Sequence, residues 1–102
     1  MKTRASHLIV VKSSAPPSVE VHTEAAAVYV RFKRAKIART IARPGSSMHI
    51  AVDLDKNGEV IGVEAVGVRE VQIARILRMA SVSAPNVDFA EARYIPAELA
   101  AL

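Results

Sequence analysis

The chain has 102 residues, and its 14 Lys and Arg residues against 10 Asp and Glu residues give a formal net charge of +4. With 51% apolar and 24% charged residues, the composition excludes a disordered chain and suits one small domain. No apolar run approaches the roughly 20 residues of a transmembrane helix. The absence of cysteine excludes disulfides and thiolate chemistry. We therefore expect a cytoplasmic protein that makes no membrane contact.

The first 17 residues differ in composition from the rest of the chain. A short β-branched run ends at Val11, and a Ser- and Pro-rich stretch follows it at 13–18. Two adjacent prolines continue neither a helix nor a central strand, so this stretch is typical of a linker. The sequence predicts an N-terminal arm and linker over 1–17 and a single domain over 18–102. We expect the arm to be ordered only where its strand pairs with a sheet edge.

Apolar and polar residues alternate with period two in much of the domain, which is typical of half-buried strands. Asn57-Gly58 lies between two such segments and predicts a hairpin whose two turn residues both have positive φ. Turns are also expected at 23–26 and 44–47. The segments with this alternation, of which the third is the weakest, are 19–22, 28–32, 37–42, 48–54 and 60–66.

Between Arg69 and Ala80 the apolar residues recur at helical spacing, with arginines on the opposite side. This pattern predicts one amphipathic helix, which Pro85 and the serines before it terminate. A helical turn at 88–93 and a short terminal helix at 97–102 are also expected. The fold class predicted is α+β: an antiparallel β-meander of four to five short strands with one amphipathic helix packed on one face.

Large apolar side chains are scarce in this chain. It has 18 Ala and 14 Val residues but only two Phe and two Tyr, so each core contact stabilises weakly. A small core of this kind gains from a second subunit, and we expect a homodimer. One interpretation of the helix is that it only packs against its own sheet. The other is that its surplus apolar residues form the dimer surface, and these are Ile73, Ile76 and Met79.

Two segments carry a resemblance to a known family. Val21 to Phe32 reads VHTEAAAVYVRF, and Val52 to Glu64 reads VDLDKNGEVIGVE. With the threonine-bearing segment at Ala38 to Thr40, they make residues 19–68 resemble domain of unknown function family 2283, which contains small prokaryotic proteins. Two acidic positions of that family are His22 and Ala26 here. The resemblance implies the strand-rich fold and an antitoxin-like partner role, and it implies no particular activity.

Part of the second segment also satisfies a calcium-loop pattern. An EF-hand loop supplies Ca²⁺ with oxygen ligands at fixed positions and ends on a bidentate Glu. The flanking segments alternate with period two, so no helix enters or leaves the loop. This favours the alternative, a solvated hairpin turn, and we expect no metal or other cofactor. The residues that match the pattern are Asp53, Asp55, Asn57 and Glu64.

The net positive charge of the chain comes from 31–43, where six basic residues and no acidic residue occur. The rest of the chain has 8 basic and 10 acidic residues. A basic hairpin of this kind binds nucleic acid through phosphates or contacts an acidic protein partner. Its alternative role is a solvated edge that deters aggregation. The six basic residues are Arg31, Lys33, Arg34, Lys36, Arg39 and Arg43.

The sequence offers little for catalysis. The three histidines, His7, His22 and His49, have no metal-binding spacing, and no serine lies in a G-x-S-x-G turn. Our leading hypothesis is therefore a non-catalytic, dimeric protein-binding module that contacts an acidic partner. The alternative is nucleic-acid binding through the basic hairpin from Arg31 to Arg43. An enzyme is the third and least favoured class.

Overall fold

The computed structural model describes residues 8–43 and 48–96. Within them one α-helix, one short 3-10 helix and eight strands are present. Each of the five segments predicted as strands is a strand in the structure, with limits within two residues of those predicted. The elements are β1 (Ile9–Val10), β2 (Ser18–His22), β3 (Ala27–Arg31), β4 (Arg39–Arg43), β5 (His49–Leu54), β6 (Val60–Val66), α1 (Ile73–Ala80), β7 (Val82–Ser83), η2 (Phe89–Glu91) and β8 (Arg93–Pro96).

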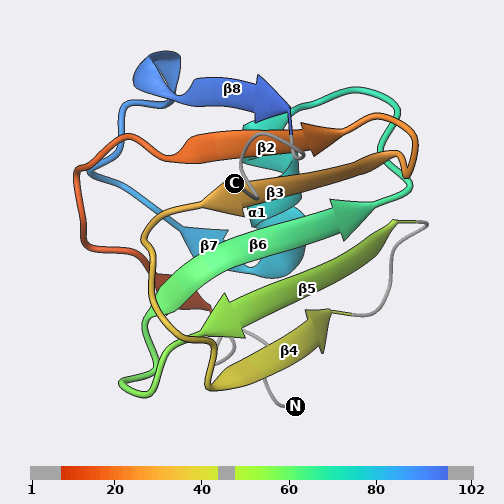
Figure 1. Cartoon of the computed structure of the whole chain (residues 1–102). Helices are drawn as coiled ribbons and strands as arrows, with labels where there is room; N and C mark the ends of the chain where they lie inside the picture. The colour runs from red at the N-terminus through yellow and green to blue at the C-terminus, as the bar shows by residue number, and fades with distance from the viewer. Residues whose placement is uncertain (1–7, 44–47, 97–102) are drawn as a thin grey trace, which may run out of the picture.

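Six strands form the main sheet in the order β4-β5-β6-β3-β2-β8. All neighbours are antiparallel except β2 and β8, which run parallel. Helix α1 lies behind this sheet and covers one of its faces (Figure 1). The α+β fold class is therefore confirmed: a helix packs on a mostly antiparallel sheet. No helix in the described part of the chain is long and apolar enough to cross a membrane.

The sheet order differs from a simple meander at one connection. β3 pairs with β2 and β6, whereas β4 pairs with β5, so β3 and β4 are not neighbours. After β3 the chain continues along β6, because the N–H groups of Phe32 and Lys33 both donate to the Ile61 carbonyl. The single hairpin predicted over 31–43 is wrong, since β6 and β5 lie between its two expected strands.

A row of small branched side chains crosses the sheet beneath the helix. Val19, Val30, Val63 and Val52 are direct register partners on four adjacent strands, and each has 0% of its surface exposed. Period-two alternation puts them all on one face, so strand pairing alone assembles a continuous apolar layer. The core thus lies between this layer and α1.

Helix α1 contributes its apolar side to the same core. Ile76 is 1% exposed, Ile73 is also buried, and Met79 is partly buried against the same cluster. The prediction that these side chains form a dimer surface is wrong for Ile73 and Ile76, because the chain's own sheet covers them. The helix contacts three strands, β5, β6 and β7. Because these strands cover a wide part of the helix surface, its apolar residues can be buried even though they extend beyond one narrow stripe.

The N-terminal segment packs on the domain through its short strand. β1 pairs in parallel with β7, and the N–H groups of Ile9 and Val11 donate to the carbonyls of Ser81 and Ser83. Val11 and Pro17 are buried. The strand of the N-terminal arm therefore pairs with an edge, as expected for an ordered arm, and that edge is β7. The turn at 44–47 and the terminal helix at 97–102 lie outside the described residues.

The predicted hairpin at Asn57-Gly58 is confirmed by the antiparallel pairing of β5 with β6. Its turn differs from the expected type, because only Gly58, at φ +80°, has positive φ, and Asn57 does not. The Gly58 N–H donates to the Asp55 carbonyl, and the Asp55 N–H donates to the Glu59 carbonyl. This is a longer hairpin loop whose one left-handed residue follows an ordinary turn, which is why glycine is required only there.

Candidate functional site

A row of polar side chains crosses the sheet on the face that α1 leaves open. The Tyr29 hydroxyl on β3 donates to Oδ2 of Asp53 on β5 over 2.8 Å. Thr40 Oγ1 on β4 donates to the other Asp53 oxygen over 2.6 Å. Burial and the bond to Asp53 raise the pKa of Tyr29 above its ordinary value. Tyr29 therefore stays protonated and acts as a hydrogen-bond donor.

Tyr29 reaches Asp53 only because Gly62 on the intervening strand β6 has no side chain. A Cβ built at Gly62 would lie 2.3 Å from a ring carbon of Tyr29. That separation is far below van der Waals contact, so the tyrosine ring occupies the space above this glycine. The register places Gly62 opposite Asp53, which completes the path from β3 across β6 to β5.

The row continues toward β2 through an ion pair. Arg31 donates to both oxygens of Glu20, from Nε over 2.5 Å and from Nη2 over 3.1 Å. Its guanidinium carbon also lies 4.8 Å from the centre of the Tyr29 ring. Glu20 is only 7% exposed, so its charge requires this partner. Arg31 is consequently held in an ion pair that stabilises the fold.

This polar row is a network of hydrogen bonds that joins four strands of the sheet. Both oxygens of Asp53 accept a hydrogen bond, and both oxygens of Glu20 are held by Arg31. A satisfied network of this kind fixes strand register. Nowhere in residues 8–43 and 48–96 do three or more His, Asp or Glu side chains gather in a way that could hold a metal ion.

The residues of the calcium pattern point to different partners. Asp55 Oδ1 accepts the N–H groups of Asn57 and Glu59 over 2.8 and 3.0 Å, while Oδ2 accepts Lys33 Nζ over 2.7 Å. Asp53 belongs to the polar row, and Glu64 is exposed on β6. The residues of the pattern thus belong to a hairpin, in which the Asp55 carboxylate caps the N–H groups of the turn.

Asp55 provides a pH-dependent contribution to stability. The bond to Lys33 and the Glu59 N–H hold the pKa of Asp55 below its ordinary value of 3.8. The stabilisation is therefore present at neutral pH and is lost as the pH falls below 3.8 through the folded-state pKa. We expect Asp55→Asn, which keeps an acceptor for the turn, to be less stable than wild type at pH 7 and to approach it at pH 2.

Urea unfolding between pH 7 and pH 2 measures this convergence. Glu91→Gln, at an exposed position of η2, removes one negative charge elsewhere and serves as the matched control. A stability difference between wild type and Asp55→Asn that stays constant over this pH range would contradict the assignment.

The six basic residues of 31–43 differ in their contacts and exposure. Arg31 pairs with Glu20, Lys33 Nζ contacts Asp55 and also Glu59 over 2.9 Å, and Arg43 Nε donates to the Ala80 carbonyl over 2.8 Å. The structure therefore does not bring these charges together as one stripe. The members of the set that are exposed are Arg34, Lys36 and Arg39.

Strand β4 forms one edge of the sheet (Figure 1). Among the described strands its only neighbour is β5, so its other side carries main-chain N–H and C=O groups with no strand beside them. β8 forms the opposite edge, but Pro96 within it lacks an N–H. An additional strand therefore fits β4 better than β8. Sequence reasoning missed this site because an edge is defined only by the sheet order.

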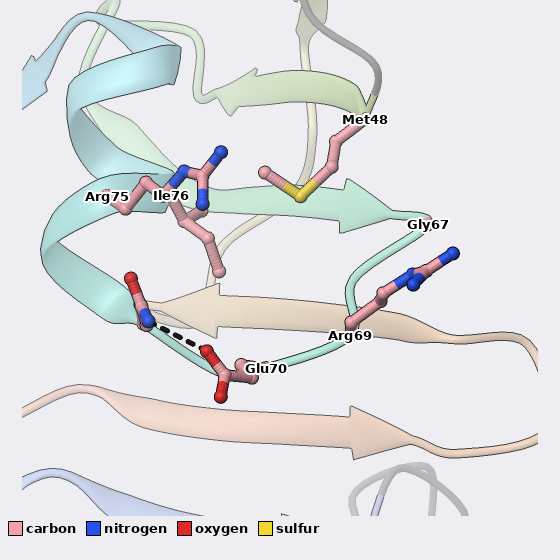
Figure 2. A pocket seen from close by; sticks show the side chains of 7 residues that line it. Met48, Gly67, Arg69, Glu70, Arg75 and Ile76 are labelled. Atoms are coloured by element: carbon pink, nitrogen blue, oxygen red, sulfur yellow. Dashed lines mark hydrogen bonds between the residues drawn. The ribbon is translucent and has the colours of Figure 1, made fainter.

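A hollow of about 480 Å³ lies at the start of α1, over Ile76. Figure 2 shows Met48 and Arg75 extending over Ile76, with Arg69 on the far side and Glu70 at the rim. Gln72 Nε2 donates to the Glu70 carboxylate over 3.0 Å. The rim carries both signs of charge, and its arginines are exposed on opposite sides. No single ligand chemistry follows from this arrangement. The hollow could not be predicted from the sequence, because it forms where Met48 lies beside the loop that follows β6.

Comparison of the chain with family models, curated proteins and solved structures found no match.

Proposed function

We propose that this chain is a non-catalytic protein-binding module whose partner adds a strand to the free edge of β4. The observation that carries the proposal is the position of β4, a five-residue strand at the end of a six-stranded sheet. Addition of a strand to such an edge forms a ladder of main-chain hydrogen bonds, which supplies affinity largely independent of sequence.

The charges around β4 favour an acidic partner. Arg39 lies on the strand, and Arg34 and Lys36 are exposed in the segment that leads to it. Acidic side chains on an incoming segment would meet this positive charge, which accelerates encounter and selects against basic segments.

The same charges oppose pairing between two copies of β4. An antiparallel pair centred on Ile41 would place Arg39 opposite Arg43 of the second copy, and like charges directly opposite are destabilising. The homodimer expected from the sequence is thus the less favourable occupant of this edge. Nucleic-acid binding loses support as well, because Arg31 and Lys33 are held in ion pairs.

A blocked edge tests the proposal. The Asp55 N–H donates to the Glu59 carbonyl across the β5–β6 hairpin, so the Leu54 N–H points to the other side, toward β4. In the antiparallel ladder its register partner Arg39 therefore directs its N–H toward β5, and the next residue, Thr40, directs its N–H away from β5. Thr40→Pro removes this outward N–H, spares the main-chain bonds to β5, and is the blocked-edge variant. We expect immobilised wild-type protein to capture a partner from lysate of the native host, and the blocked-edge variant to lose it.

Arg78→Ala, on the exposed side of α1, is the control that should retain the partner. A partner captured equally by the blocked-edge variant would refute strand addition. Capture abolished by nuclease would instead indicate nucleic acid. A wild-type dimer that the blocked-edge variant converts to a monomer would assign the edge to a second copy.

A further inference from the structure

We infer that the strand added to β4 carries an acidic-x-apolar-x-acidic pattern, with these three side chains on the side of the sheet that α1 covers. The inference rests on the proposed function and specifies the chemistry of the partner. It follows from the register of β4 and from the environment of three of its residues.

The register fixes the direction of the β4 side chains. Arg39, Ile41 and Arg43 are partners of Leu54, Val52 and Ile50, which are buried in the core beneath α1. Paired residues in a ladder point to the same face, so these three β4 side chains point toward the helix layer. The bond from Arg43 Nε to the carbonyl of Ala80, the last residue of α1, shows the same direction.

Ile41 determines the middle of the pattern. It is partly buried against the core and is the register partner of Val52, so it extends the apolar row that begins at Val19. A strand beyond β4 would place one side chain directly beside Ile41, with the two Cβ atoms about 4.5–5.5 Å apart. An apolar residue there covers the exposed part of Ile41 and continues the row by one strand.

The two arginines determine the flanking positions. Residues two places before and after the apolar one fall opposite Arg39 and Arg43, where carboxylates would form cross-strand pairs with guanidinium groups. Arg43 also donates from Nε to the Ala80 carbonyl, which places its side chain on this face of the sheet. On the other face the strand presents Thr40 and Ala42, which are small and uncharged. Because the pattern is symmetric, it holds whether the added strand runs parallel or antiparallel to β4.

Two labelled peptides of identical composition test the pattern. Each has four threonines, two glutamates and one isoleucine. The matched peptide places both glutamates two residues from the isoleucine, and the permuted peptide places them next to it. In the permuted peptide the isoleucine and the glutamates point to opposite faces. By fluorescence anisotropy we expect the matched peptide to bind about tenfold more tightly than the permuted one.

A charge swap tests the contact with Arg39. Arg39→Glu should weaken binding of the matched peptide, and replacing one of its glutamates by lysine should restore binding to that variant. Arg34→Glu makes the same change in net charge outside the strand and should have a much smaller effect. Equal binding of both peptides, or equal effects of the two charge reversals, would overturn the inferred pattern.

The proposed function has a separate outcome in the same experiment. If both peptides bind equally and the blocked-edge variant loses both, strand addition stands and only the pattern fails. If neither peptide binds at millimolar concentration, or the blocked-edge variant binds both unchanged, strand addition at β4 is refuted together with the pattern.

Discussion

Ile76→Asp is expected to abolish the folded state. Ile76 is 1% exposed on the side of α1 that faces the sheet and belongs to the hydrophobic core. Burial of an unpaired polar group costs several kcal/mol, and a charge costs more, against a total stability of about 5–15 kcal/mol for a small domain. Circular dichroism should show loss of the cooperative thermal transition.

Two companion variants separate burial from other effects of this substitution. Ile76→Val keeps an apolar side chain and should lower stability by only about 0.5–1.5 kcal/mol. Ala74→Asp places the same charge on the exposed side of α1 and should cost about 1 kcal/mol or less, because it alters mainly helix propensity. A folded monomer from Ile76→Asp would contradict this account, and it is the result that a dimer surface at Ile76 would give.

β3 shows why strands could be predicted, because it has one buried face and one more open face. Val28 and Val30 alternate with Tyr29 and Arg31, and burial follows this alternation in the structure. The same pattern carries no information about which strand lies beside which. The separation of β3 from β4 therefore could not be derived, and with it the free edge of β4. Pro96 is the last residue of the parallel edge strand β8, whose pairing with β2 was not predicted either.

The polar contacts were hidden for a related reason. The positive charge of 31–43 is visible in the composition, but the partners of Arg31 and Tyr29 are 11 and 24 residues away in the chain. Only the register brings Glu20 and Asp53 to them. Sequence reasoning therefore found the right strands and the right charges, but it assigned to a binding surface residues that hold the sheet together.

The pairing of Tyr29 with Gly62 predicts a strongly coupled stability effect. Gly62→Ala should destabilise the protein by about 1–3 kcal/mol, because the new methyl group meets the Tyr29 ring and displaces it from Asp53. Gly62 does not have positive φ, so alanine brings no backbone strain at this position. Without the ring above it, alanine in a strand should be better than glycine by roughly 0.5–1 kcal/mol.

A double-mutant cycle in urea measures the coupling. In a Tyr29→Ala background, Gly62→Ala should be neutral or stabilising, so the two changes should differ from additivity by more than 1 kcal/mol. In a Tyr29→Phe background the ring remains, and Gly62→Ala should still destabilise, although the bond to Asp53 is already gone. Additive effects in both backgrounds would mean that the ring does not need the space above Gly62. Destabilisation that depends on the ring, but not on its hydroxyl, would show that Gly62 is required for packing, and that this packing positions Tyr29 to join β3 to β5.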